Sequence, residues 1–151
     1  MILIDTNALI LLIVGLVDES LIKTHKRCSI YNRNDFYDLL AVIKDFKNLI
    51  VLPNVWTEVD NLLNNFSGDY KWIYIQQVIT IIKESTEKYL HTKLGFENDA
   101  FWDLGLTGSL LLDIGKECDF IITSDSKLSD YALANGLKVD DLVKIKNQSF
   151  R

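Results

Sequence analysis

Short apolar runs alternate along this chain with longer stretches in which apolar residues recur every three or four positions. The short runs are typical of strands buried on both faces of a sheet, and the longer pattern is typical of helices that bury one face. Because the two patterns alternate throughout, the sequence predicts an α/β protein with a parallel sheet. The predicted strands are residues 1–4, 49–52, 118–123 and, at an edge, 142–145. The predicted helices are residues 8–14, 35–46, 53–66, 69–89, 107–114 and 127–134, with a loop at 94–106.

Polar and helix-breaking residues mark several of these boundaries. Thr6 and Asn7 have side chains suited to capping the first helix, and Gly15 is expected to end or loosen it. Pro53 suits the first turn of a helix, because that turn leaves its N–H groups unbonded and proline has none. We therefore expect one helix directly after the first strand and another directly after the second.

The composition is that of one globular domain spanning residues 1–151, with 48% hydrophobic and 25% charged residues. The apolar runs are too short for a membrane span and no basic leader precedes them, so we expect a soluble cytoplasmic protein without membrane contact. Cys28 and Cys118 lie far apart in the sequence. This separation favours reduced structural thiols over a disulfide or a metal site.

The net charge of −5 argues against non-specific duplex binding, which depends on many Lys and Arg contacts to phosphate. It is compatible with a nucleic-acid enzyme whose acids gather around metal ions. Residues 21–33 form the most basic stretch of the chain. A solvated surface is the favoured interpretation of this stretch, and a phosphate-contacting edge is the alternative.

Acidic residues follow the predicted strands at similar places. Asp5 comes directly after the first strand, and Asp125 lies two residues after the third. Parallel strands place their carboxyl ends at one edge of the sheet, so these two carboxylates can approach each other. Glu58 lies about one turn into the helix after the second strand, and hence at the same edge. Carboxylates gathered there repel one another unless a cation intervenes, and their oxygens suit Mg²⁺ or Mn²⁺.

Each of these acids also has a simpler structural interpretation. Asp5 and Asp125 can act only as helix N-caps, and Glu58 can occupy a first turn where it favours the helix dipole. The convergence of all three acids on one edge favours a metal site over three separate roles. A metal ion at such a site, alone or as one of a pair, activates water and stabilises charge in phosphodiester cleavage.

The order of these motifs resembles the PIN domain family. The resemblance covers nearly the whole chain and rests on four segments: Asp5-Thr6-Asn7, Thr57-Glu58-Val59 after Pro53, Leu104-Gly105-Leu106-Thr107, and Thr123-Ser124-Asp125 with Leu128. It implies a three-layer sandwich of helices around a mainly parallel sheet, and a metal-dependent endoribonuclease that uses Mg²⁺ or Mn²⁺. It also implies that Asp5, Glu58 and Asp125 are catalytic metal ligands. Asn7 and Thr123 match residues that support the site.

The resemblance also implies partners. Many small single-domain members of this family are toxins of bacterial toxin–antitoxin pairs, so it implies an RNA substrate and an antitoxin protein. Apolar residues spread over more than one face of the predicted helix at 69–89, among them Ile73, Ile75, Val78 and Ile82. This spread indicates burial against a partner as well as the core, and we expect a homodimer.

One position departs from the family pattern. Similar sequences carry an acid directly after Leu-Thr, where this chain has Gly108. Asp103, in the predicted loop, is the candidate replacement ligand. Asp113 is excluded because it lies about 140° further round the helix. Gly108 supports a second hypothesis, a catalytically inactive protein of the same fold that acts by binding RNA or protein. A receiver-like phosphotransfer module ranks last, because the lysine or aspartate-centred motif that it requires is not found in the sequence.

Overall fold

The structure is a computed structural model, and it describes residues 1–143. Its centre is a sheet of parallel strands in the order β3-β2-β1-β4-β5. The strands are β1 (Ile2–Ile4), β2 (Leu49–Val51), β3 (Thr86–Glu87), β4 (Phe120–Thr123) and β5 (Val139–Asp141). This parallel sheet confirms the α/β class predicted from the sequence. The strand order reverses beside β1, because the chain runs outward through β2 to β3 and then returns to β4.

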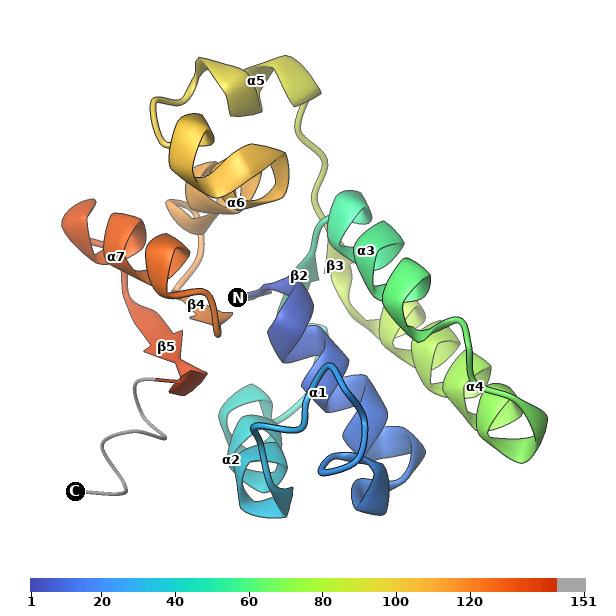
Figure 1. Ribbon diagram of the computed structural model, residues 1–151. Helices are drawn as coiled ribbons and strands as arrows, with labels where there is room; N and C mark the ends of the chain where they lie inside the picture. Colours follow the sequence, from blue (N-terminus) through green and yellow to red (C-terminus); the bar gives the residue numbers. More distant parts are fainter. Residues whose placement is uncertain (144–151) are drawn as a thin grey trace.

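Helices flank the sheet on both faces, which confirms the three-layer sandwich (Figure 1). α1 packs against α2, α3 and α4, whereas α6 packs against α5 and α7. The helices are α1 (Thr6–Val17), α2 (Arg33–Ile43), α3 (Pro53–Leu63), α4 (Gly68–Glu84), α5 (Thr92–Glu97), α6 (Phe101–Gly115) and α7 (Ser126–Ala134). Within residues 1–143, no helix is both long enough and apolar enough to cross a membrane.

β1 and α1 form the middle of the hydrophobic core. Every residue of α1 from Ala8 to Val14 is fully buried. A helix that is apolar on all sides must be covered on all sides, and α1 contacts three helices and β4. Asp5 caps α1, with its carboxylate accepting a hydrogen bond from the Thr6 N–H at 2.6 Å. The prediction that Thr6 and Asn7 form the cap is therefore wrong, because the helix already begins at Thr6.

Gly15 lies inside α1, which corrects the prediction that it ends or loosens the helix. A Cβ atom at this position would lie 2.3 Å from the ring of Phe36 on α2. The glycine is therefore needed for the close approach of α1 and α2 rather than for a helix end.

We expect Gly15→Ala to destabilise the protein even though alanine has the higher helix propensity. The buried Phe36 ring has little room to move aside, and overpacking of this kind costs about 1–3 kcal/mol. Urea unfolding followed by circular dichroism measures the loss. In a double-mutant cycle, the same alanine should cost less in a Phe36→Leu background. An alanine variant as stable as the parent would show that the two helices do not meet this closely.

The predicted loop at 94–106 is wrong, because it contains most of α5 and the first turn of α6. Gly105 interrupts α6 with a φ of +73°, a backbone conformation that favours glycine. Gly95 lies in α5 and packs closely against Leu106 and Leu110. The two glycines and the exposed aromatic residues beside them indicated a loop where the chain is helical. Only Gly105 leaves the helical conformation.

Two sheet edges also differ from the prediction. The long helix at 69–89 ends at Glu84 and is followed by β3, a strand of two exposed residues that the sequence pattern did not indicate. The edge strand expected at 142–145 lies earlier in the chain, as β5 at Val139–Asp141. Residues 144 and 145 of that prediction lie outside the described residues.

Candidate functional site

Asp5 lies at the carboxyl end of the central strand, where the strand order reverses between β1 and β4. Open α/β sheets bind their ligands outside the strand ends at such a reversal. The Asp5 N–H extends the β1–β4 ladder by donating to the carbonyl of Ile122 at 3.0 Å. Asp5 is 7% exposed, and its carboxylate accepts from the Thr6 N–H at 2.6 Å and from Thr123 Oγ1 at 2.8 Å. The acid is therefore held rigidly at the edge of the sheet.

Asp125 is joined to Asp5 through Thr123, the last residue of β4. Thr123 Oγ1 donates to Asp5 and accepts from the Asp125 N–H at 2.9 Å. Asp125 also caps α7, because its Oδ1 accepts from the N–H groups of Lys127 and Leu128 at 2.9 and 3.2 Å. Among residues 1–143, its second oxygen has no hydrogen-bond donor. The capping role predicted as the simpler alternative is thus present, and it leaves one carboxylate oxygen for a ligand.

Glu58 projects from α3 and is held by hydroxyl groups on two other helices. Thr6 Oγ1 of α1 donates to Glu58 Oε2 at 2.6 Å. Thr107 Oγ1 of α6 donates to Glu58 Oε1 and accepts from Asn54 Nδ2 at 3.1 Å. Sequence reasoning missed the roles of Thr6, Thr107 and Asn54. Thr6 and Thr107 lie within two of the four segments that resemble the family, beside Asp5 and Gly108, and this was the available signal.

The three predicted acids share one cavity of about 240 Å³. It is lined by Asp5, Thr6, Asn7, Glu58, Leu62, Leu104, Thr107, Gly108 and Asp125. The lining comes from α1, α3, α6 and α7 or their N-caps. It lies at the carboxyl ends of β1 and β4. Asn7 is exposed at the cavity wall. The structure therefore brings together the acids that the sequence placed on one sheet edge.

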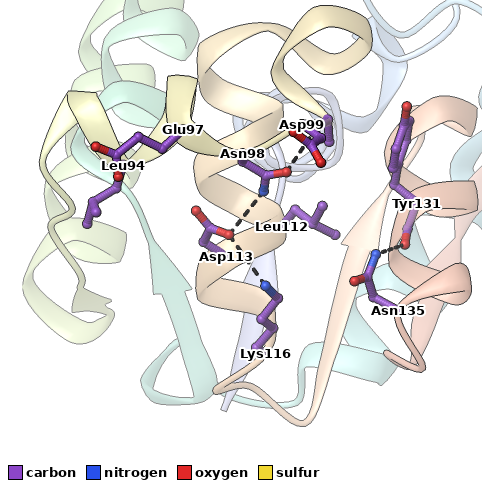
Figure 2. A pocket seen from close by; sticks show the side chains of 10 residues that line it. Leu94, Glu97, Asn98, Asp99, Leu112, Asp113, Lys116, Tyr131 and Asn135 are labelled. Carbon is purple, nitrogen blue, oxygen red and sulfur yellow. Dashed lines mark hydrogen bonds and ion pairs between the residues drawn. The ribbon is translucent and has the colours of Figure 1, made fainter.

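The structure does not bring the other candidate acid to this cavity. Asp103, on the first turn of α6, accepts a hydrogen bond from the Tyr131 hydroxyl and is not among the lining residues. Asp113, excluded from the sequence, lines a different cavity of about 450 Å³ (Figure 2). There it accepts from Asn98 Nδ2 at 3.0 Å and lies 3.6 Å from Lys116 Nζ. The prediction that Asp113 is not a metal ligand agrees with its position outside the cavity of Asp5, Glu58 and Asp125.

The electrostatics of the cavity disfavour the charged form of Asp5. Burial raises the pKa of the Asp5 carboxyl above its ordinary value. Hydrogen bonds from Thr123 and Thr6 act in the opposite direction, and the neighbouring charges of Asp125 and Glu58 raise the pKa again. A cation in the cavity would remove this repulsion and stabilise the ionised form.

The donor set fits a hard divalent cation in its chemistry. Carboxylate and hydroxyl oxygens line the cavity, and no cysteine or histidine does. Oxygen ligands of this kind suit Mg²⁺ and Mn²⁺. Within the described part of the chain, no three acidic, histidine or cysteine side chains already surround one point closely enough to hold an ion. Each carboxylate oxygen of Asp5 and Glu58 accepts one hydrogen bond from the protein, which leaves each oxygen a second lone pair for an ion.

Gly108 lines the cavity where the family pattern has an acid. A Cβ atom there would lie 2.8 Å from Cβ of Leu104, in the turn before the Gly105 kink. The glycine lies inside α6, after the kink at Gly105. A side chain at position 108 therefore requires the kinked turn to move, so the missing acid and the kink belong to one local arrangement.

Comparisons of this chain with protein-family models, with curated proteins and with solved structures gave no match.

Proposed function

We propose that this protein is a metal-dependent endoribonuclease that uses Mg²⁺ or Mn²⁺. The observation that carries the proposal is the shared cavity of Asp5, Glu58 and Asp125 at the strand-order reversal of a parallel sheet. Acids on three separate elements line it, although their mutual repulsion opposes the charged state of Asp5. Natural proteins tolerate such repulsion where it serves a function.

The cavity residues have distinct parts in this proposal. Asp5 and Asp125 hold the metal, and Thr123 fixes the position of both by its two hydrogen bonds. Glu58 completes the acidic set and orients a water molecule, while its two threonine donors fix the position of its carboxylate. The bound ion supplies Lewis-acid activation of water and neutralises charge on the phosphate. Asn7, exposed at the cavity wall, supplies in this proposal an amide that donates to a phosphate oxygen of the substrate.

The choice of RNA as substrate, and of a toxin role with an antitoxin partner in the cytoplasm, is supported by the resemblance to PIN domains. The acidic cavity itself supports phosphodiester hydrolysis without naming the nucleic acid. An adjacent gene for a small antitoxin-like protein would support the toxin role directly.

Cleavage of single-stranded RNA by the purified full-length protein tests this proposal. We expect cleavage with Mg²⁺ or Mn²⁺ and none with EDTA. Glu58→Gln should lower the rate by about a hundredfold, because it removes a charge that the metal and water require. Glu87→Gln, on the exposed edge strand β3, is the matched control and should cleave like the parent. Equal cleavage by the Glu58→Gln variant, or cleavage that persists in EDTA, would overturn the proposal.

A second candidate is a protein of the same fold that binds RNA or protein without cleaving. The close contact between position 108 and Leu104 favours it, since a further acid there would require the turn that contains Leu104 to move. Under this alternative, the parent protein cleaves no RNA at millimolar Mg²⁺ or Mn²⁺. Metal-dependent cleavage by the parent would exclude it.

A further inference from the structure

Helix α4 carries an exposed apolar stripe, formed by Trp72, Ile75, Ile79 and Ile82. Each of these four side chains is between 40% and 66% exposed. They follow one another at spacings of three, four and three residues, which is the a/d spacing of a coiled-coil seam. Monomeric soluble proteins rarely expose a contiguous apolar surface of this kind, and such a surface typically marks an interaction site.

The α4 stripe is separate from the face by which the helix joins the core. That inner face is anchored by Tyr74 and Ile81, which are buried. At about 100° per residue, the stripe is centred roughly 120° round the helix from Tyr74. α4 lies at the outside of the molecule beside α3, as Figure 1 shows. The helix therefore has two apolar faces, and only the inner one is used within the described chain.

The stripe is symmetric along the helix. Positions 72 and 82, and likewise 75 and 79, lie at equal distances on either side of residue 77. A two-fold axis through this point, perpendicular to α4, would place an identical helix antiparallel to the first. Trp72 would then pack against Ile82 of the second copy, and Ile75 against Ile79 of the second copy. Isologous interfaces require this kind of self-complementarity.

The charges beside the stripe agree with the same pairing. Asp69 and Lys83 occupy the heptad position that directly follows d, and this position meets its own counterpart in an antiparallel pair. Asp69 would therefore meet Lys83 of the second copy, twice by symmetry, with Gln76 facing itself between them. Asp69 and Lys83 are exposed, and neither forms an ion pair within residues 1–143. A parallel pair would bring like positions level and lose both opposite-charge contacts.

We propose that the α4 stripe is a homodimer interface in which α4 packs antiparallel against α4 of a second copy of this chain. The groove between α3 and α4 adds to the contact surface, since a cavity of about 300 Å³ there includes Trp56, Val78 and Ile82 in its lining. Stable interfaces bury about 800 Å² per partner, so the contact is expected to extend beyond the stripe into this groove. Trp72 is the expected anchor, because buried tryptophan dominates interface energetics. The proposal is independent of the proposed nuclease function.

Sedimentation of the full-length protein across micromolar concentrations tests the interface. We expect a dimer for the parent and a monomer for Ile75→Glu and for Ile79→Glu, because either change places two carboxylates in the seam. Leu133→Glu, at a comparably exposed apolar position on α7, is the matched control and should remain dimeric. A monomeric parent, including one whose stripe serves another protein, would overturn the proposal. A dimer that survives both glutamate substitutions would overturn it as well.

Charge reversal tests the antiparallel register with surface changes that leave the fold intact. Asp69→Lys and Lys83→Asp should each raise the dimer dissociation constant by roughly tenfold, since each turns two attractive pairs into repulsive ones. The double variant Asp69→Lys/Lys83→Asp should restore the parent's dissociation constant. Additive weakening in the double variant would contradict the register.

Cross-linking distinguishes the two helix directions. In the antiparallel pair, Gln76→Cys faces its own counterpart and should be joined to it by a short bis-maleimide reagent. Trp72→Cys should not be joined to itself, because its counterpart lies about 15 Å away along the helix pair. Efficient cross-linking of Trp72→Cys together with failure of Gln76→Cys would establish a parallel pair and overturn the proposal.

Discussion

Asp5→Asn should raise the stability of the metal-free protein at neutral pH and at the same time abolish its metal-dependent activity. Burial, together with the charges of Asp125 and Glu58, raises the pKa of Asp5, so the folded state holds this proton more tightly than the unfolded chain does. Stability is consequently lost as the pH rises from the ordinary aspartate pKa of 3.8 through the raised value in the fold. Asparagine carries no charge to desolvate, so this loss of stability with rising pH should be absent in Asp5→Asn.

Thermal unfolding in EDTA from pH 4 to pH 8 measures this effect. The Asp5→Asn variant should melt a few degrees higher than the parent at pH 8, and the difference should shrink toward pH 4. RNA cleavage should fall by about a hundredfold or more in the same variant. Asp141→Asn is the matched control, because Asp141 is equally buried at the end of β5 but does not line the cavity. A destabilised, fully active Asp5→Asn protein would refute the account of this residue.

Substitution of Gly108 should separate the packing of α6 from the chemistry of the cavity. Gly108→Ala should cost about 1–3 kcal/mol, because the added Cβ meets Cβ of Leu104 at 2.8 Å. For a chain of this size that cost corresponds to a melting temperature lower by roughly 3–10 °C. Gly108→Asp should lose at least as much stability in EDTA. It also adds a fourth carboxylate to the cavity, so Mn²⁺ should stabilise it more than it stabilises Gly108→Ala.

Gly108→Ala is the steric control for Gly108→Asp. The alanine variant shares the steric cost and lacks the carboxylate, so any difference in Mn²⁺ response or RNA cleavage reports the added acid alone. Gain of cleavage only in Gly108→Asp would favour the non-cleaving alternative for the parent. A Gly108→Ala variant as stable as the parent would show that the turn before Gly105 yields easily.

The sequence predicted the central strands well because they are buried on both faces. Continuous apolar runs such as 2–4 and 49–52 have few other structural interpretations, and parallel pairing then places Asp5 and Asp125 at one edge. β3 escaped prediction because a two-residue exposed edge strand has no hydrophobic pattern. Local patterns thus identify the buried sheet better than its edges.

The remaining differences depend on contacts between segments far apart in the sequence. Gly15 looked like a helix end, and only the Phe36 ring packed against it explains its position. The hydroxyl groups of Thr6 and Thr107 meet on Glu58 although about fifty residues separate each of them from it. No periodicity encodes such a meeting, because it depends on how α1, α3 and α6 pack.

Binding of Mn²⁺ to the metal-free full-length protein tests whether the acidic cavity is a metal site, and isothermal titration calorimetry measures it without any assumption about the substrate. We expect saturable binding by the parent at neutral pH, with affinity reduced by at least about tenfold in Asp5→Asn. Asp141→Asn should bind like the parent. Absence of binding by the folded parent at millimolar Mn²⁺, or equal binding by Asp5→Asn, would show that Asp5 does not belong to a metal site.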